Sequence, residues 1–231
     1  MSPATIEERV REVRGRIEAA ARRAGRDPRS VRLLAATKQV PPERIAEAVA
    51  AGVDALGENR IQEARSKLAA FRGVRPLHMI GHLQRNKAKT AVELFDVVES
   101  VDSLELAQLL SRLVSERGGT LGVFVEVNTS GEPGKYGIEP AGARALALEA
   151  AALPGLAVAG LMTVGPLTDD EAAVRRAFRR LVELREEIAR DLASMRDGAL
   201  SMGMSGDLEA AVEEGSTLVR VGTAIFGERA R

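Results

Sequence analysis

Five lysines are spread along the chain, and only one of them ends an apolar segment. Lys38 follows VRLLAAT (31–37), whose length and composition are typical of a buried strand. A lysine amine that loses part of its hydration at such a position has a lowered pKa and can form a Schiff base with a carbonyl carbon. The alternative is an amine that reaches solvent beyond the strand end. The lysines at 67, 87, 89 and 135 fall on predicted helices or in a turn and are expected to be solvated.

A second charged side chain interrupts an apolar segment near the other end of the chain. In STLVRVG (216–222), strand alternation places Arg220 on the same face as Leu218 and Gly222. A guanidinium inside a buried strand needs acceptors for its N–H groups. The sequence leaves two sources open, which are a carboxylate of the protein and a bound ligand.

Small and polar residues gather in two further segments. SMGMSG (201–206) precedes a helical pattern in which Ser205 or Asp207 is the expected N-cap, and Gly222 and Thr223 follow the last apolar run. Backbone amides at a helix start bind anions, and barrels often bind phosphate between the loops after strands seven and eight. Either loop alone could be an ordinary turn. With Lys38, they place an aldehyde-capturing amine and a phosphate cradle at one rim.

For the other ionisable residues, the sequence gives weaker evidence of a functional role. His78 lies within a predicted strand and is expected to be packed, whereas His82 follows that strand and is equally open to a packing role or a site role. Glu213 and Glu214 end a predicted helix and are expected on a solvated face. The two histidines do not have the carboxylate spacing of a metal site.

The candidate site residues named above are positioned by a regular alternation of predicted strands and helices. Apolar runs without strict alternation indicate a parallel sheet that is covered on both faces. The absence of GxGxxG after the first strand disfavours the alternative, a doubly wound open sheet. The sequence therefore predicts an α/β fold in which residues 1–231 form one domain, a (β/α)8 TIM barrel. The predicted strands are 31–37, 53–57, 77–81, 95–100, 121–128, 155–162, 199–202 and 216–222, and the predicted helices are 5–23, 42–51, 60–70, 84–93, 103–117, 140–152, 169–193 and 207–214.

Composition excludes several classes of protein. The 231 residues contain 45% hydrophobic and 29% charged side chains, which is ordinary for a globular chain. The absence of cysteine excludes a disulfide scaffold, a zinc ribbon and a thiol nucleophile. A net charge of +0 and 3% aromatic residues argue against a nucleic-acid partner. No apolar run suits a signal peptide or a membrane span, so a cytoplasmic location without membrane contact is expected.

Six segments, in order across nearly the whole chain, resemble the YggS/PROSC family of pyridoxal phosphate homeostasis proteins. They are AATKQV (35–40), GENRIQEA (57–64), HMIGHLQRNK (78–87), VNTSGEPGKYGI (127–138), GLMTVGP (160–166) and SMGMSGDLEAAVEEGSTLVRVGTAIFGER (201–229). The resemblance implies a fold like the N-terminal barrel of alanine racemase, a fold-type III barrel. It also implies the cofactor pyridoxal 5′-phosphate (PLP). Leu77 departs from the family, which usually has Phe or Trp before this histidine.

The resemblance also implies which residues contact the cofactor. Lys38 is the Schiff-base lysine that holds PLP as an internal aldimine, and Arg220 contacts the pyridine nitrogen. The phosphate is held by Ser205, Gly222 and Thr223, and the pocket is lined by Asn59 and Met202. No residue is assigned a catalytic role by the resemblance.

An arginine at the pyridine nitrogen keeps that nitrogen unprotonated and makes the ring a weaker electron sink. Racemisation also needs a second base opposite the lysine, and the one tyrosine, Tyr136, falls in a predicted turn. We therefore expect a PLP-binding homeostasis protein without robust turnover, with PLP-dependent apo-enzymes as possible partners. The alternative is a small PLP-dependent amino-acid racemase that uses Lys38 and either a water or His82.

The expected oligomeric state is a monomer, or at most a weak dimer. In the 169–193 segment the apolar residues form one stripe at helical spacing, which packing on the chain's own barrel would use up. The stripe consists of Val174, Phe178, Leu181, Leu184 and Ile188.

Overall fold

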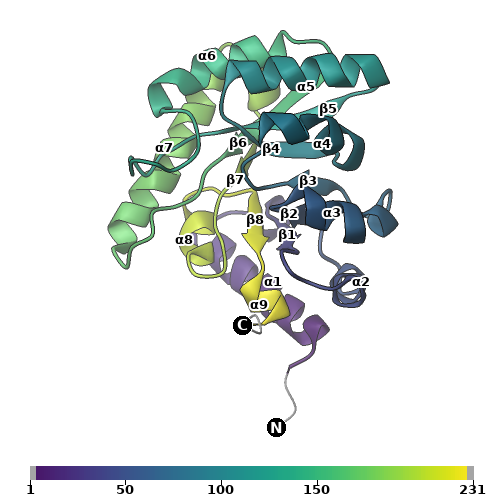
Figure 1. Cartoon of the computed structure of the whole chain (residues 1–231). Helices are drawn as coiled ribbons and strands as arrows, with labels where there is room; N and C mark the ends of the chain where they lie inside the picture. Colours follow the sequence, from purple (N-terminus) through teal and green to yellow (C-terminus); the bar gives the residue numbers. More distant parts are fainter. Residues whose placement is uncertain (1–3, 228–231) are drawn as a thin grey trace.

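Residues 4–227 are described by a computed structural model in which eight parallel strands close into a barrel. Each strand pairs with its neighbours in sequence, and β1 pairs with both β2 and β8 (Figure 1). The strands are β1 (Arg32–Ala36), β2 (Ala55–Glu58), β3 (Leu77–Met79), β4 (Val97–Val101), β5 (Leu121–Glu126), β6 (Leu156–Met162), β7 (Ala199–Ser201) and β8 (Leu218–Val221). The predicted (β/α)8 barrel is confirmed, whereas the assignment of all 231 residues to one domain stays a prediction.

Helices form the outer layer of the barrel, with α1 before β1, α9 after β8 and the others between strands (Figure 1). They are α1 (Ile6–Arg23), α2 (Pro42–Ala50), α3 (Ile61–Lys67), α4 (Ala88–Leu94), α5 (Leu104–Arg117), α6 (Pro140–Ala151), α7 (Glu171–Ala189), α8 (Leu208–Glu213) and α9 (Thr223–Phe226). Four residues are too few for a periodic apolar pattern, which is why the sequence did not indicate α9.

Local sequence determines where the longer helices begin. Thr5 and Glu8 form the capping box of α1, in which the Glu8 N–H donates to Thr5 Oγ1 at 3.2 Å. Asp170 begins α7 because its Oδ1 accepts from the N–H groups of Ala172 and Ala173, at 3.0 and 3.2 Å. The helix predicted over 169–193 therefore begins two residues later and ends at Ala189.

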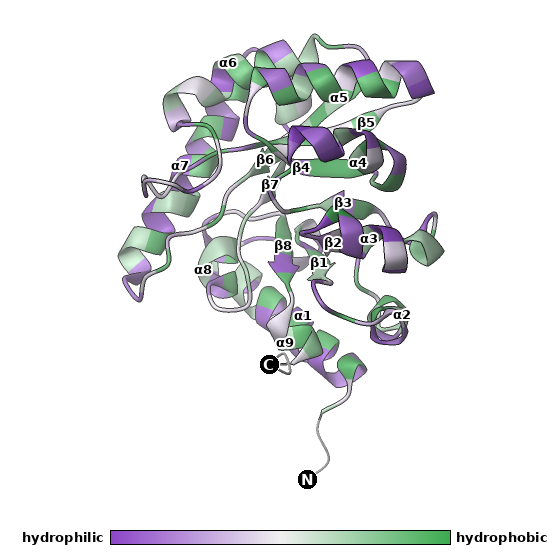
Figure 2. Cartoon of the chain, viewed as in Figure 1, coloured by the Kyte–Doolittle hydropathy of each residue, from purple (hydrophilic) through white to green (hydrophobic). Residues whose placement is uncertain are grey.

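The hydrophobic core has two parts, one on each face of the sheet. The larger part fills the space between strands and helices, and α7 contributes its whole predicted stripe to it. The smaller part lies inside the barrel and is made of Leu34, Ala55, Phe124, Met162, Ala199 and Leu218. Figure 2 shows the strands as mainly hydrophobic, whereas the outer helices alternate between hydrophobic and hydrophilic residues. This pattern is what a sheet covered on both faces requires.

The barrel closes where β8 meets β7 and β1. The β7–β8 pairing is short, with Ser201 opposite Leu218, and is extended by a hydrogen bond from the Arg220 N–H to the Gly203 carbonyl at 2.9 Å. Outside this closure, α1 packs against α8 and α9. An ion pair of 2.6 Å between Arg16 Nε and Glu209 Oε1 joins α1 to α8. The first and last helices of the described chain are therefore neighbours.

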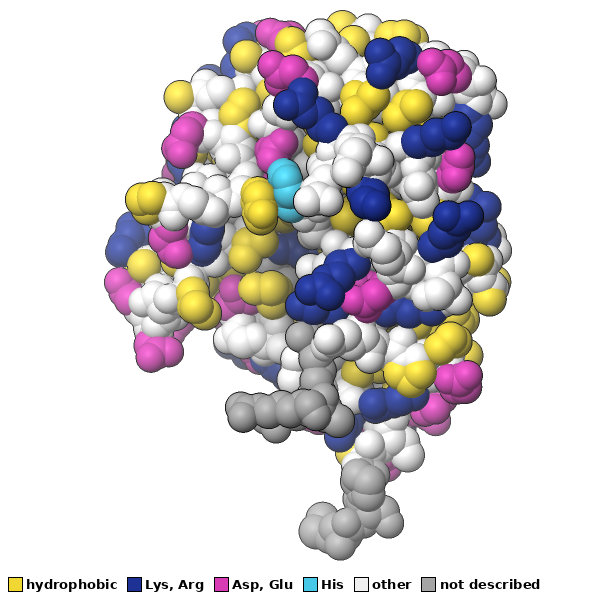
Figure 3. Space-filling model, viewed as in Figure 1, with side chains coloured by type: hydrophobic (Ala, Val, Ile, Leu, Met, Phe, Trp, Pro, Cys, Tyr) yellow, Lys and Arg dark blue, Asp and Glu magenta, His cyan; other side chains and the backbone are white. Residues whose placement is uncertain are grey.

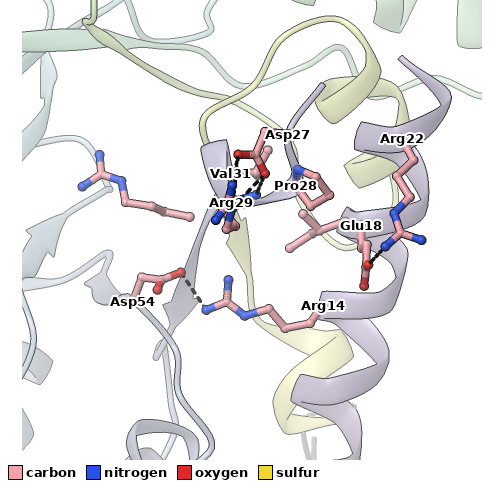
Figure 4. Close-up of a pocket in the computed structure, with 10 residues that line it drawn as sticks. Arg14, Glu18, Arg22, Asp27, Pro28, Arg29, Val31 and Asp54 are labelled. Carbon is pink, nitrogen blue, oxygen red and sulfur yellow. Dashed lines mark hydrogen bonds and ion pairs between the residues drawn. The ribbon is translucent and has the colours of Figure 1, made fainter. Parts of the chain in front are cut away.

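A cleft of about 640 Å³ lies at the amino-terminal end of β1, opposite the end that carries Lys38 (Figure 4). Arg14 reaches from α1 and donates to the Gly52 carbonyl at 2.8 Å and to Asp54 Oδ2 at 2.7 Å. The same Asp54 oxygen accepts the Leu33 N–H at 2.6 Å. These contacts tie α1, β1 and β2 together, which is the stabilising role usual for this end of a barrel.

Basic and acidic side chains are mixed over the face of the molecule seen in Figure 3. That face therefore has no continuous basic field of the kind that binds nucleic acid. Among the helices of residues 4–227, none combines the length and the apolar composition needed to cross a bilayer.

Candidate functional site

Lys38 lies in a tight turn at the carboxyl end of β1. The turn runs from Thr37 to Val40 and is closed by a hydrogen bond of 2.9 Å from the Val40 N–H to the Thr37 carbonyl. Gln39 has a φ of 59°, a left-handed conformation that is uncommon for residues other than glycine. The Lys38 side chain is half-buried. Lys38 is thus placed at the barrel end where functional loops are found.

The other lysines differ in their surroundings. Lys89 is exposed, and Lys87 and Lys135 are half-buried. The prediction that Lys67 is solvated is wrong, because its side chain is only 8% exposed and its Nζ lies 2.6 Å from Glu58 Oε2. The physical reason is that α3 presents this side chain to the end of β2, where a buried carboxylate neutralises it.

Arg220 is buried inside the barrel, opposite Leu34 of β1 in the strand register. Its Nη1 donates to Ser201 Oγ at 2.6 Å, and its Nη2 donates to the Thr163 carbonyl at 2.8 Å. Within residues 4–227, no carboxylate oxygen forms an ion pair with this guanidinium. Burial lowers the pKa of Arg220, while the negative field of Glu99, Glu126 and Asp207 opposes this. The acceptors found are therefore a hydroxyl and a backbone carbonyl.

A chain of polar side chains crosses the barrel interior from Arg220. Ser201 Oγ donates to Glu99 Oε2 at 2.5 Å, and Glu99 Oε1 lies 2.5 Å from His78 Nδ1. Burial acts to raise the pKa of Glu99, but His78, Arg220 and Ser201 together hold it below its ordinary value. His78 is packed inside the barrel, as predicted.

Glu126 lies at the end of β5 and is 5% exposed. Its Oε2 atom is buried without a hydrogen-bond partner in the described part of the chain. Burial, and then repulsion by Asp102, raises the pKa of Glu126 to about 7, although Arg220 opposes the shift. Sequence reasoning missed Glu99 and Glu126, and it placed Ser201 only within the SMGMSG segment. The available signal was a carboxylate inside the apolar runs FDVVES (95–100) and LGVFVEVN (121–128).

The loops after β7 and β8 meet at the same end of the barrel as Lys38. Ser205 Oγ accepts the N–H of Ala224 at 3.3 Å, so the first loop contacts the start of α9. Ser205 is half-buried and Thr223 is exposed, whereas Met202 is buried. Asp207 is the residue before α8, but its Oδ1 accepts the Met204 N–H at 2.5 Å and makes no capping bond to the helix.

Two backbone positions at this rim have little free space. A Cβ added to Gly222 would lie 3.2 Å from the Ala36 carbonyl oxygen, so Gly222 packs against the strand that leads to Lys38. A Cβ added to Gly81 would lie 2.5 Å from the Asn59 carbonyl oxygen. The Asn59 side chain is exposed, and the backbone N–H of Asn59 donates to Glu58 Oε1 at 2.7 Å. The predicted site residues therefore come from the ends of β1, β2, β7 and β8.

His82 occupies a different part of the rim. Its ring stacks on Tyr136 with 3.9 Å between ring centroids, and its Nδ1 lies 3.6 Å from Asp102 Oδ2. Tyr136 is 59% exposed. These residues follow β3, β4 and β5, whereas Lys38 and Arg220 belong to β1 and β8.

A groove of about 890 Å³ borders the loops after β6 and β7. It is lined by Lys135, Val164, Leu167 and Met204 among others, and includes none of the seven predicted cofactor contacts. The groove is thus a neighbour of the predicted site.

Comparison with known proteins assigns the chain to a family. The family model described as alanine racemase, N-terminal domain, matches residues 10–230. A pyridoxal phosphate homeostasis protein of Vibrio cholerae is 41% identical over 230 residues, which cover 97% of this chain and 97% of the relative. The protein of the same name from Pseudomonas aeruginosa is 45% identical over 227 residues, covering 97% and 96%.

Solved structures agree with this assignment. PipY of Synechococcus elongatus, solved with PLP bound, has a TM-score of 0.80 and 38% identity, covering 93% of this chain and 100% of that chain. An unknown protein from Bifidobacterium adolescentis has a TM-score of 0.91 and 44% identity, covering 96% and 94%. Alanine racemase of Clostridium difficile shares the fold, with a TM-score of 0.73 and 15% identity over 96% of this chain and 57% of that chain. The resemblance inferred from the sequence motifs is confirmed, and the chain belongs to the family of pyridoxal phosphate homeostasis proteins, which are built on the alanine racemase N-terminal domain.

Proposed function

We propose that this chain binds PLP, holds it covalently through Lys38, and acts in PLP homeostasis without robust turnover of amino acids. The observation that carries the proposal is the β1–β8 register. Because Leu34 lies opposite Arg220, the residues that follow in each strand, Lys38 on one side and Gly222 and Thr223 on the other, reach the same end of the barrel. This register supports a site at that end made of an amine, a buried guanidinium and a backbone cradle.

The proposed phosphate contacts fit an anion. Ser205 and Thr223 offer hydroxyl groups that are at least partly accessible, and Gly222, just before α9, packs closely against Ala36 of β1. The contact between Ser205 Oγ and the Ala224 N–H keeps the two loops together. The phosphate of PLP would lie between them, as is common for the last two loops of a barrel.

The proposed ring contacts also fit. Arg220 uses Nη1 and Nη2 for Ser201 and Thr163, while its Nε makes no hydrogen bond to residues 4–227 and remains free to donate. A positively charged donor beside the pyridine nitrogen leaves that nitrogen unprotonated, because protonation would place two positive charges together. Asn59 would contact the ring from the end of β2, whereas the Met202 side chain is fully buried in the core between strands and helices.

PLP supplies an aldehyde for attachment and a ring that withdraws electrons from a bound amino acid. Lys38 would supply the amine for this attachment. Arg220 keeps the ring a weaker electron sink than an acidic partner would, which favours storage of the cofactor over carbanion chemistry.

Borohydride reduction tests the attachment. Protein mixed with PLP is expected to gain visible absorbance, and reduction should fix the cofactor to Lys38, as shown by peptide mapping. Lys38→Ala should remain unlabelled. A label on Lys67, Lys87, Lys89 or Lys135 of the wild-type protein would contradict the assignment.

A small amino-acid racemase is the second candidate, because His82 and Tyr136 form a stacked pair near Asp102 at the same end of the barrel. Such an enzyme would remove the Cα proton with Lys38 and return one from a water or from His82. Exchange of the Cα hydrogen of alanine in deuterated water distinguishes the two functions. Rapid exchange that depends on Lys38 would favour the racemase.

The proposal also covers the oligomeric state, the protein partners and the cellular location. Burial of the apolar residues of α7 in the chain's own core supports a monomer. PLP-dependent apo-enzymes are the proposed recipients of the cofactor, in the cytoplasm.

A further inference from the structure

The two peptide groups that flank Lys38 are each held by one member of an ion pair on α3. Lys67 Nζ donates to the Thr37 carbonyl at 2.5 Å, which fixes the peptide before Lys38. Glu63 Oε2 accepts the Gln39 N–H at 2.8 Å, which fixes the peptide after it. Glu63 and Lys67 are one helical turn apart, and their charged atoms lie 3.2 Å from each other.

The same lysine is connected to the backbone of Asn59. Lys67 Nζ lies 2.6 Å from Glu58 Oε2, and the other oxygen of Glu58 accepts the Asn59 N–H at 2.7 Å. Thr37 Oγ1 also donates to Glu58 Oε2, at 3.1 Å. The ends of β1 and β2 are therefore joined through one buried ammonium group.

Burying this lysine is unfavourable unless every N–H has an acceptor. Lys67 is 8% exposed and Glu58 is fully buried, and Thr37, Glu58 and Glu63 supply one acceptor each for the three N–H donors of the ammonium group. Hydrocarbon side chains of similar size in place of both Lys67 and Glu58 would avoid the desolvation of two charges. The buried ammonium group of Lys67, unlike a hydrocarbon, can form a hydrogen bond to the turn that carries Lys38.

The turn needs such support. Gln39 has a φ of 59°, a conformation that L-residues with a side chain adopt at an energetic cost. The hydrogen bond from its N–H to Glu63 holds it there. Without the bonds from α3, this turn would relax toward ordinary backbone angles and change the direction in which Lys38 leaves β1.

We propose that Glu63 and Lys67 are positioning residues that hold Lys38 in the geometry for reversible attachment of PLP. The inference rests on the proposed function, in which Lys38 is the attachment residue. The amine of Lys38 adds to the aldehyde carbon, a carbon–nitrogen double bond forms and water leaves, and hydrolysis reverses the step with no other reactant. A fixed turn keeps the released amine close to the aldehyde, so attachment is restored before the cofactor departs.

Two variants and one control test this role. Glu63→Gln weakens the contacts to Gln39 and Lys67. The double variant Lys67→Met, Glu58→Gln removes the ammonium without leaving a buried carboxylate unpaired. Lys89→Met removes an exposed lysine of α4 and serves as the control.

Hydrogen exchange of the Gln39 amide is measured first, without PLP. Both test variants are expected to exchange at least tenfold faster than the wild type at this amide, whereas amides of β5 stay unchanged and Lys89→Met matches the wild type. Unchanged exchange at Gln39 in both test variants would overturn the inference.

Release of PLP is measured second, by transfer to an excess of a trapping amine. Both test variants should release PLP at least tenfold faster and show a shifted pH midpoint of the visible absorbance, with Lys89→Met unchanged. If the wild-type protein is labelled at Lys38 but both test variants release PLP at the wild-type rate, the positioning role alone is overturned. A wild-type protein that is not labelled at Lys38 would overturn the proposed function, and the positioning role with it.

Discussion

Arg220 and Glu99 are joined inside the barrel by one hydroxyl group, that of Ser201. Ser201 Oγ accepts from Arg220 Nη1 at 2.6 Å and donates to Glu99 Oε2 at 2.5 Å. The two opposite charges therefore interact through this hydroxyl group and not through a direct ion pair. The guanidinium is thus not held in a bidentate contact with a carboxylate. Such a fork would use two N–H groups of an arginine. This arrangement keeps Arg220 charged, oriented and able to donate to a further acceptor.

Arg220→Leu is expected to weaken PLP binding by at least tenfold and to lower the unfolding free energy of the PLP-free protein by about 1–3 kcal/mol. The stability loss comes from the Thr163 carbonyl and the Ser201 hydroxyl, which lose a donor. Removing one member of a direct buried ion pair would cost more, about 3–5 kcal/mol. Urea unfolding without PLP and a PLP titration measure the two effects. Arg112→Leu, at an exposed position of α5, should change neither.

Glu126→Gln is expected to remove a pH dependence of stability. Because the pKa of Glu126 is raised to about 7, its carboxyl is protonated in the folded protein over a range where it is ionised in the unfolded chain. Its contribution to stability is thus full below about pH 4 and is lost as the pH rises to about 7. At 1.36 kcal/mol for each pKa unit, the loss is about 3 kcal/mol.

Unfolding free energies at pH 5 and pH 8 provide the measurement for Glu126. Glu126→Gln should gain stability relative to the wild type as the pH rises between these values. Glu93→Gln replaces an exposed glutamate of α4 and should track the wild type. A parallel pH dependence of the wild type and Glu126→Gln would show that this carboxyl is ionised in the folded protein throughout.

Gly222→Ala tests the phosphate cradle. The added Cβ would lie 3.2 Å from the Ala36 carbonyl oxygen, so Ala36 or the start of α9 must shift by a few tenths of an ångström. We expect the affinity for PLP to fall by about tenfold, equivalent to about 1.4 kcal/mol. The affinity for pyridoxal, which has no phosphate, should change much less. Gly15→Ala is the matched control, since Gly15 lies in α1, away from this rim, and nothing lies within 4 Å of its added Cβ. Equal losses for PLP and pyridoxal would argue against a phosphate role.

Light scattering across a dilution series tests the proposed monomer. The apolar stripe of α7 is buried against the chain's own barrel, with Phe178 and Leu181 both at 0% exposure. An obligate dimer interface needs a large apolar surface beyond this. The expected mass is that of one chain, 24.6 kDa, at every concentration. A dimer that persists on dilution would contradict the prediction.

The strand and helix alternation was readable from sequence because each element carries its own apolar pattern. The positions of Lys38 and Arg220, at the end of one strand and within another, could also be predicted, since a charge at the end of, or within, an apolar run is a local signal. The burial of Lys67 was not readable, because it depends on Glu58, which reaches it only after β2 and α3 have packed. The contact between Ser201 and Glu99 joins residues on β7 and β4 and depends on closure of the barrel. Local patterns hold no information on such long-range contacts.

The closure of the barrel by β1 and β8 has a consequence during synthesis on the ribosome. β1 is made early, yet one of its two edges has no partner strand until β8 has been translated. A nascent chain that stops before Leu218 carries Lys38 but lacks Arg220, Gly222 and Thr223. The proposed site therefore arises in one of the last steps of translation, and truncated products would carry the reactive amine without the means to retain the cofactor.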